Sequence, residues 1–352
     1  MIRRDFLSID GRRVHLRRGG SGPPVLLVHQ SPQDSRAMLP IAERLVGRCT
    51  VIAPDTPHFG LSDSLEDATI PGFADVLAGI CEQLSLPPAL VVGVHTGALT
   101  AVEFAVRHPD RVDRVIADGY GLFTDEERES ILDGYLPPNP PRDDGGHLRW
   151  LWQRLRDHYV FFPWHVKRAA NRLAYNLPEP AAIHRAAMEI LPRGDDYIGG
   201  YRAPFVYRRG EQLGKLQRPV LFLYREDDVL APHADRLPPL PEECRVEMIG
   251  PGRAGADDRI IAAASAWATE QRAAPGVPLP SQGERLVGRA GSQLRMITTG
   301  AGPDLLLLHD LGRSADSVEG VAARLADTFT VHRLDLPGHG HSDPIDGHWS
   351  PA

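Results

Sequence analysis

The sequence predicts an α/β protein with a mostly parallel sheet, helices on both faces and a helical insertion above the sheet. Short apolar runs rich in β-branched residues alternate with segments of helical spacing. Parallel strands need such an order, because each crossover between them requires a long connection, usually a helix. Between residues 123 and 215 the alternation gives way to aromatic and basic residues with helical spacing and proline breaks, which indicates the insertion.

The expected strands and helices follow one another along the first part of the chain. The first strand, at 24–29, is short and continuously apolar, which is typical of a strand buried on both faces. A segment of helical spacing and a second apolar run follow it, and the same order then repeats. The expected strands are 24–29, 50–54, 90–93, 112–117 and 219–223, and the expected helices are 39–46 and about 97–107.

Two parts of the chain are similar to each other at a constant offset of 280 residues, the difference between His309 and His29 (309 minus 29). Matched pairs include Gly22 with Gly302, Leu26 with Leu306, Arg44 with Arg324, Asp55 with Asp335 and Ser62 with Ser342. Residues 273–282, rich in proline, predict a linker, and 283–352 predict an incomplete second copy. Such a fragment buries too little surface to fold alone, so we expect a truncated tandem protein or a segment packed on the first domain.

Composition and charge exclude several classes of protein. A net charge of -7 argues against nucleic acid as a partner, and the absence of a long apolar run argues against a membrane span. The N-terminus lacks the apolar core of a signal peptide, so we expect a cytoplasmic protein. Three widely spaced cysteines favour reduced thiols over disulfides or a zinc site. We therefore expect a small-molecule substrate or ligand, no metal and no cofactor; the sequence does not predict the oligomeric state.

A five-residue segment, Gly93-Val94-His95-Thr96-Gly97, follows the apolar run at 89–92. The pattern glycine-x-nucleophile-x-glycine is typical of a sharp strand-to-helix turn that strains its central residue. Both glycines are needed there, because side chains would collide with the neighbouring backbone. Histidine tolerates a positive φ better than most residues, so the turn is expected to form with an imidazole in place of an alcohol.

These features resemble the α/β-hydrolase superfamily over residues 1 to about 272. The segment 54–63, Pro-Asp-Thr-Pro-His-Phe-Gly-Leu-Ser-Asp, is similar to a segment of that family, and the second copy carries a closer match. Val28-His29-Gln30 is similar to the family's His-Gly turn, although glutamine replaces the glycine. The resemblance implies a hydrolase domain at 1–272 with a cap at about 123–215.

The resemblance also implies a degenerate catalytic triad. The family's acid follows a late strand in a D-x-x-x-P context, which Asp228 matches. The family's histidine is expected near residue 255, but the segment 249–255 contains no histidine, and Arg253 is its only ionisable residue. Serine is absent as well, since His95 takes its place.

One interpretation makes His95 catalytic. An imidazole reaches further than a serine hydroxyl, so His95 could approach Asp228 and form a pair with it. Asp228 would hold one ring nitrogen as a donor and leave the other free as a general base or nucleophile. The backbone amides of Gln30 and Thr96 would supply an oxyanion hole. This interpretation predicts hydrolysis of a small acyl substrate, either an ester, a lactone or an amide.

Two other interpretations stay open. The chain could be a catalytically inactive member of the fold that binds a small ligand, or it could carry out lyase or oxygenase chemistry. A pair between Arg253 and Asp228 would favour the inactive protein. Possible pocket residues are His29, His58, Trp164 and Arg253, although turn contacts and cap packing would also account for the first three.

Overall fold

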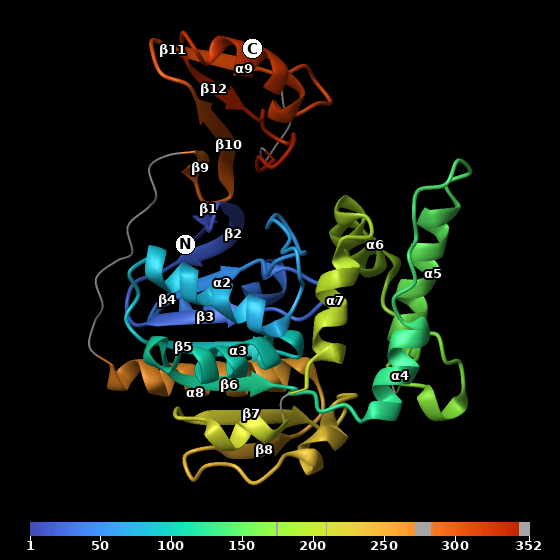
Figure 1. Ribbon diagram of the computed structural model, residues 1–352. Coiled ribbons are helices and arrows are strands. Elements are labelled where there is room, and N and C mark those ends of the chain that lie inside the picture. Colours follow the sequence, from blue (N-terminus) through green and yellow to red (C-terminus); the bar gives the residue numbers. More distant parts are fainter. Residues whose placement is uncertain (174, 209, 272–282, 345–352) are drawn as a thin grey trace.

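The computed structural model describes residues 1–344 apart from 174, 209 and 272–282. The predicted linker at 273–282 therefore lies outside the described residues. Within them, a large sheet with helices on both faces forms the body of the molecule. A helical cap lies beside this body and a smaller sheet lies beyond its N-terminal hairpin (Figure 1).

The large sheet has eight strands in the order β1-β2-β4-β3-β5-β6-β7-β8. β1 and β2 form an antiparallel hairpin, β2 pairs antiparallel with β4, and the remaining pairs are parallel. The strands are β1 (Ile2–Ile9), β2 (Arg12–Gly19), β3 (Pro24–Val28), β4 (Thr50–Pro54), β5 (Ala89–Val94), β6 (Val112–Asp118), β7 (Val220–Arg225) and β8 (Arg245–Ile249). The predicted mostly parallel sheet is confirmed, and the structure adds β1, β2 and β8 to it.

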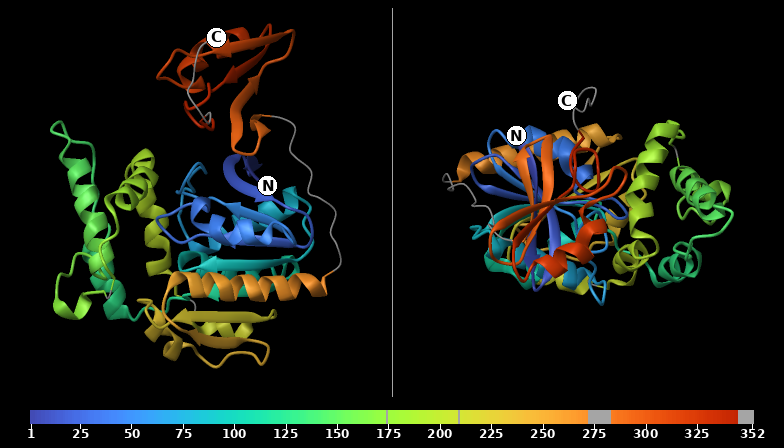
Figure 2. Two further views of the ribbon diagram at one scale, coloured as in Figure 1. Left: turned by 180° about the vertical axis from the view of Figure 1, so that it is seen from behind. Right: turned by 90° about the horizontal axis from the view of Figure 1, so that it is seen from above.

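Helices cover both faces of this sheet, and the central strands β3 and β5 are apolar and buried at every position. Leu26 and Val28 of β3 belong to one hydrophobic layer, with α2 (Ile70–Gln83) and α3 (Thr96–Arg107). The alternate residues of β3 belong to the opposite layer, with α1 (Leu39–Leu45) and α8 (Arg253–Glu270) (Figure 2). Alternation of side chains across a strand thus accounts for an apolar run that shows no polar face.

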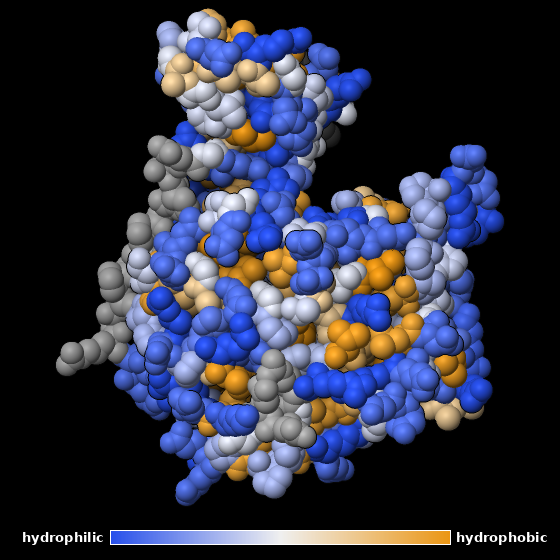
Figure 3. Space-filling view, viewed as in Figure 1, coloured by the Kyte–Doolittle hydropathy of each residue, from blue (hydrophilic) through white to orange (hydrophobic). Residues whose placement is uncertain are grey.

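The cap is inserted between β6 and β7. Its helices are α4 (Asp125–Gly134), α5 (Gly146–Val160), α6 (Pro180–Ile190) and α7 (Tyr197–Val206). They have their own apolar cluster, which includes Tyr135, Leu151, Trp164, Tyr201 and Phe205. In the space-filling view, hydrophobic residues gather over α7 and the inner side of the cap (Figure 3). The expected helical insertion is therefore present, beside the carboxyl ends of the parallel strands.

Short 3-10 helices complete the connections. They are Ser35–Met38, Pro109–Arg111, Ala169–Asn171, Leu191–Arg193, Gly210–Lys215, Ala231–Arg236 and Ala315–Val318.

The smaller sheet repeats the start of the large one. Its strands are β9 (Glu284–Arg289), β10 (Ser292–Thr299), β11 (Asp304–Leu308) and β12 (Thr330–Leu334), accompanied by α9 (Glu319–Leu325). The strand order, β11-β12-β10-β9, is that of β3, β4, β2 and β1. Hydrogen bonds recur as well: the Arg13 amide donates to Asp63 Oδ2 at 2.8 Å, and the Gln293 amide donates to Asp343 Oδ2 at 2.8 Å. The offset of 280 residues thus relates two structural copies.

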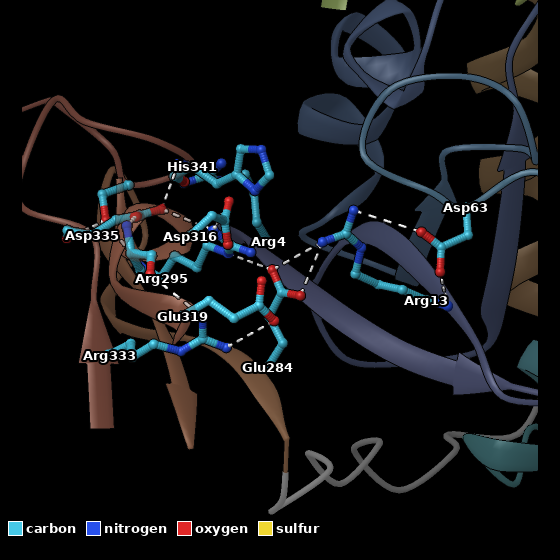
Figure 4. A network of polar contacts seen from close by, with 12 residues as sticks. Arg4, Arg13, Asp63, Glu284, Arg295, Asp316, Glu319, Arg333, Asp335 and His341 are labelled. Atoms are coloured by element: carbon cyan, nitrogen blue, oxygen red, sulfur yellow. Dashed lines mark hydrogen bonds and ion pairs between the residues drawn. The ribbon is translucent and has the colours of Figure 1, made fainter. Parts of the chain in front are cut away.

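The two copies meet through their equivalent hairpins. Gln293 Oε1 accepts from the Arg4 amide at 2.6 Å, and Gln293 Nε2 donates to the Arg4 carbonyl at 3.0 Å. Arg13 pairs with Glu284 at 3.0 Å, and Figure 4 shows its guanidinium between Glu284 and Asp63. At the offset of 280, Arg4 is equivalent to Glu284, and Arg13 to Gln293. Each copy therefore uses the same two positions in the junction.

Two further expectations concern membranes and thiols. In the part of the chain that the structure describes, no helix is long and apolar enough to cross a bilayer. The three cysteines are free, with Cys49 and Cys81 buried and Cys244 half-buried. Burial raises the pKa of the Cys81 thiol to about 12, which leaves it unreactive at neutral pH.

Candidate functional site

His95 stands at the apex of the turn between β5 and α3. Its backbone has φ 48° and ψ -107°, a strained conformation for a residue with a side chain. A Cβ on Gly93 would lie 2.0 Å from the carbonyl oxygen of Gly97, and a Cβ on Gly97 would lie 2.1 Å from that of Val28. Both glycines are therefore required by close backbone approach, and the turn holds the imidazole above the sheet.

The imidazole of His95 reaches Asp228, which follows β7. Nε2 of His95 lies 2.9 Å from Oδ2 of Asp228. An ionised carboxylate only accepts hydrogen bonds, so Nε2 carries the proton and Nδ1 keeps its lone pair. Gly119 makes room for this arrangement, because a Cβ there would lie 2.4 Å from Cδ2 of His95. Nδ1 is on the opposite side of the ring and forms no hydrogen bond with any described residue.

Charge around the pair lowers the pKa of Asp228 and raises the pKa of His95. Burial alone would raise the pKa of Asp228, but His95, the Leu230 amide at 2.9 Å and Arg225 Nη2 at 2.5 Å lower it below its usual range. Burial alone would lower the pKa of His95, yet the attraction and hydrogen bond of Asp228 raise it above 6.5. The pair therefore holds a proton more strongly than an isolated histidine does.

Two backbone amides lie beside the imidazole. Gln30 follows β3 and Thr96 begins α3, and neither amide donates to another described residue. The Thr96 hydroxyl accepts from the Ser31 amide at 3.4 Å, so this side chain is directed toward the β3 loop. The N-terminus of α3 adds the positive end of its dipole. Gln30 and Thr96 line the same cavity as His95, and their amides are not engaged by other described residues.

A cavity of about 220 Å³ opens above the pair, between the sheet and the cap. Its floor contains His95 and Asp228 with Arg225, and its walls are mostly apolar and aromatic. The cap contributes Phe123, His158, Tyr159, Phe162, Leu173, Tyr175, Tyr201, Pro204 and Phe205. An apolar cavity with a few convergent polar groups is typical of a small-molecule site.

His158 of α5 also lines this cavity, and the sequence analysis did not single it out. Its Nδ1 lies 3.0 Å from the hydroxyl of Tyr135. Burial, together with the positive charges of Arg154 and His95, lowers the pKa of His158 to about 4, so it is neutral at neutral pH. No local pattern marks this residue, because only the folding of the cap brings it opposite His95.

The structure corrects the expected pocket positions of His29 and His58, since neither lines this cavity. His29 is buried, and its Nε2 accepts from the Thr56 amide at 2.9 Å. His58 Nδ1 lies 3.1 Å from Asp196 Oδ1, which ties the β4 loop to the start of α7. Both histidines therefore hold loops in place.

The expected pocket positions of Trp164 and Arg253 are corrected as well. Trp164 packs inside the cap and donates from Nε1 to the Tyr135 carbonyl at 2.8 Å. Arg253 pairs with Asp118 and, at 2.7 Å, with Asp257. It therefore does not form the pair with Asp228 that would have favoured an inactive protein; Arg225 occupies that position instead.

Comparison with known proteins identifies the family. Residues 23–245, more than half of the chain, match the family model described as the alpha/beta hydrolase fold. The chain belongs to the α/β-hydrolase fold family. This α/β-hydrolase is 33% identical over 121 residues to the 2-(acetamidomethylene)succinate hydrolase of Mesorhizobium japonicum, covering 34% of the chain and 44% of that protein. It is 29% identical over 127 residues to the cis-3-alkyl-4-alkyloxetan-2-one decarboxylase of Shewanella oneidensis, covering 35% and 40%. The matches thus span less than half of these relatives.

Solved structures agree on the fold of this α/β-hydrolase. An esterase from Exiguobacterium antarcticum has a TM-score of 0.58 at 17% identity, covering 75% of this chain and 98% of its own. An enol-lactonase from Burkholderia xenovorans has a TM-score of 0.57 at 17% identity, covering 75% and 99%. At such identities the likeness shows the fold alone.

Proposed function

We propose that this α/β-hydrolase hydrolyses a small acyl substrate, either an ester, a lactone or an amide, with His95 and Asp228 as its catalytic pair. One observation carries the proposal: Asp228 holds Nε2 of His95 at 2.9 Å, and Nδ1 of this cavity-lining side chain forms no hydrogen bond with a described residue. An oriented imidazole with one free nitrogen has the form of a general base.

In the proposed reaction, Nδ1 of His95 takes a proton from water as the water oxygen attacks the acyl carbon. Asp228 stabilises the imidazolium that forms, and the amides of Gln30 and Thr96 bind the carbonyl oxygen as it becomes negative. Collapse of the tetrahedral intermediate breaks the bond to the alcohol or amine, which leaves with the proton held by His95. Water thus supplies hydroxide to the acid product and a proton to the leaving group. Direct attack by Nδ1, followed by hydrolysis of the acyl-imidazole, has the same stoichiometry.

The cavity and the relatives support this class of reaction. Aromatic walls exclude water, which strengthens the interaction of the amides with a developing charge. Among the proteins that this chain resembles, one is named a hydrolase of 2-(acetamidomethylene)succinate, one an esterase and one an enol-lactonase. Acyl hydrolysis is the chemistry these names share.

Turnover of short acyl esters, lactones and amides by the purified chain tests the proposal. His95→Ala and Asp228→Asn should each lower kcat/KM by about 10²-fold or more, since each removes the oriented base. His108 offers a matched control, because its Nε2 bonds Asp75 at 2.8 Å on the protein surface, away from the cavity. His108→Ala should leave turnover unchanged. Turnover that survives His95→Ala would contradict the proposal.

Two alternatives retain specific support. Arg225 bonds the same Asp228 oxygen as His95, as expected if the pair serves only to shape a ligand site. One relative is named a decarboxylase, which is a non-hydrolytic activity. Reaction in ¹⁸O-labelled water separates these cases, because hydrolysis places the label in the acid product. A decarboxylation releases carbon dioxide and forms no ¹⁸O-labelled acid product, and a binding protein retains its ligand unchanged.

A further inference from the structure

Arg154 of α5 is a buried cation without an acidic partner. Its side chain is only 3% exposed, and its guanidinium stacks on the rings of Trp164 and Tyr197, 5.7 and 5.5 Å from their centroids. Among the residues that the structure describes, Arg154 forms no hydrogen bond or ion pair, and its Nε is buried without an acceptor.

Stacking alone leaves such a group unsatisfied. A guanidinium has five N–H donors, and burying them without acceptors is unfavourable. Two acidic residues of the cap are engaged elsewhere: Asp157 pairs with Lys167 at 2.6 Å, and Asp195 accepts from the Asn139 amide at 3.0 Å. The packing of the cap therefore fixes Arg154 in place without neutralising it.

Arg154 lines a second cavity, of about 120 Å³, next to the one above His95. The two cavities share five wall residues, Gln30, Ser31, His158, Tyr159 and Tyr201. Within this shared wall, the hydroxyl of Ser31 is also buried without a described hydrogen-bond partner. The two cavities therefore adjoin at these residues, with His95 in the lining of one and Arg154 in the lining of the other.

One acidic residue, Glu189 of α6, lines the second cavity with Arg154. Its closest cation is Arg36, at 3.9 Å, and it forms no ion pair with Arg154. Burial, followed by the charge of Asp34, raises the pKa of Glu189 to about 7. Near neutral pH, Glu189 is therefore only partly ionised, and its protonated form can donate a hydrogen bond to an anion.

We propose that Arg154 binds a carboxylate of the substrate, so that the acyl compound cleaved at His95 is the monoester, monoamide or lactone derivative of a dicarboxylic acid. The inference rests on the proposed function for the reaction, but the carboxylate site is independent of it. Arginine suits this role because its planar fork binds a carboxylate through two parallel hydrogen bonds.

Binding of free diacids tests the site without any turnover. The full chain is titrated calorimetrically with diacids from succinate to suberate and with the neutral diamide of each. The titrations measure the affinity for each compound and the preferred chain length of the diacid. The best diacid should bind the wild-type chain at least about 10-fold more tightly than its diamide, since hydrogen bonds to charged groups contribute that much. Arg154→Met should weaken the diacid about 10- to 100-fold and leave the diamide unchanged.

Two variants control for folding and for general charge. Arg154→Lys keeps the charge but loses the fork, so it should bind the diacid with intermediate affinity. Arg149→Met removes an exposed arginine from the same helix and should behave as wild type. If Arg154→Met does not fold, the proposal is tested by the ratio of diacid affinity to diamide affinity, measured for the wild-type chain and for Arg154→Lys. Equal binding of diacid and diamide by the wild-type chain would overturn the proposal.

Kinetics then separate this inference from the proposed function. With monomethyl and dimethyl adipate as substrates, Arg154→Met should lower kcat/KM for the monoester alone. If neither ester is cleaved but diacid binding depends on Arg154, the hydrolase proposal fails and the carboxylate site stands. If both esters are cleaved through His95 and Arg154→Met affects them equally, the carboxylate site fails.

Discussion

His95 occupies the apex position of a turn that normally presents an alcohol, and the surrounding residues are arranged around that change. Arg253 begins the helix after the last strand, where the resemblance placed the base, and it is held by Asp118 and Asp257. Asp228 is thereby left to His95 and Arg225. A single imidazole therefore occupies the apex position of the turn and contacts the acid that the resemblance pairs with the missing base.

The raised pKa of His95 predicts how activity depends on pH. A general base works only when it is unprotonated, so kcat/KM should rise with pH and level off above an inflection higher than 6.5. Asp228→Asn removes the charge that favours the imidazolium, and burial then dominates. The inflection should therefore move to lower pH while the plateau falls. Rate profiles of the wild type and Asp228→Asn provide the check, and an inflection that stays in place would contradict the coupling.

At the scale of elements, the central strands were predictable and the N-terminal hairpin was not. β3 and β5 are continuous apolar runs, and β4, β6 and β7 each contain a shorter apolar run, because both faces of the sheet are covered. β1 and β2 carry buried charges that break any apolar pattern. Arg18 pairs with Asp5 at 3.0 Å, and His15 pairs with Asp55 at 2.8 Å. Polar side chains that are satisfied only by tertiary partners cannot be recognised as buried from sequence periodicity.

The candidate site, like the sheet, contains some residues that were predictable from sequence and others that were not. His95 and Asp228 lie in segments that resemble the family's elbow and acid, so the resemblance predicted that the two side chains could approach each other. His158, Tyr175 and Arg154 come from the cap, whose helices pack through non-local contacts. No sequence pattern marks these three residues, because their positions depend on which face of each cap helix is turned toward the sheet.

The helical turn after β7 predicts an acid sensitivity of the fold. His233 is buried there, and its Nδ1 accepts from the Leu122 amide at 2.8 Å, which joins this turn to the base of the cap. Burial and Arg236 lower the pKa of His233 to about 4. Between pH 6.5 and 4, His233 is protonated in the unfolded chain but stays neutral in the folded chain. The free energy of unfolding therefore falls as the pH falls, by roughly 1–3 kcal/mol.

Urea unfolding at pH 7 and pH 5 measures this effect. His233→Asn keeps an acceptor for the Leu122 amide and removes the titrating group, so its stability should fall less over that interval than that of the wild type. His158 acts in the same direction and His95 in the opposite one, and both are common to the two proteins. His184→Asn, an exposed substitution on α6, should keep the wild-type dependence. An unchanged pH dependence in His233→Asn would be inconsistent with this account.

At the scale of the whole molecule, the sheet of the second copy lacks most of the elements that pack on the sheet of the first copy. Leu306 and Leu308 of β11 are 57% and 49% exposed, whereas the equivalent Leu26 and Val28 of β3 are fully buried. In the first copy, α2, α3 and β5 cover that surface, and the described residues of the second copy contain no counterpart of them. The smaller sheet therefore depends strongly on the hairpin junction for its stability.

Loss of the junction contact should loosen the second copy selectively. Gln293 is 1% exposed and satisfies both the amide and the carbonyl of Arg4. Gln293→Ala leaves these groups unpaired, at a cost of about 1–3 kcal/mol, so amides of β9 and β10 should exchange with deuterium about 10- to 100-fold faster. Exchange in β3 to β8 of the large sheet should not change. Arg313→Ala, an exposed change in the same copy, is the control, and equal exchange in both variants would refute the role of Gln293.

The junction also distinguishes this pair of copies from other pairings of the same surface. Arg4 contacts Gln293, which is the equivalent of Arg13, and Arg13 contacts Glu284, which is the equivalent of Arg4. The contact therefore has the form of a two-fold interface within one chain. Two first copies docked in this way would set Arg4 against Arg13 twice, and like charges would repel. In the second copy, Glu284 and Gln293 stand at these two positions. Arg13 therefore forms an ion pair with Glu284, and the backbone of Arg4 forms neutral hydrogen bonds with Gln293. Self-recognition between first copies is thereby disfavoured, and the unlike copy on the same chain is the matching partner.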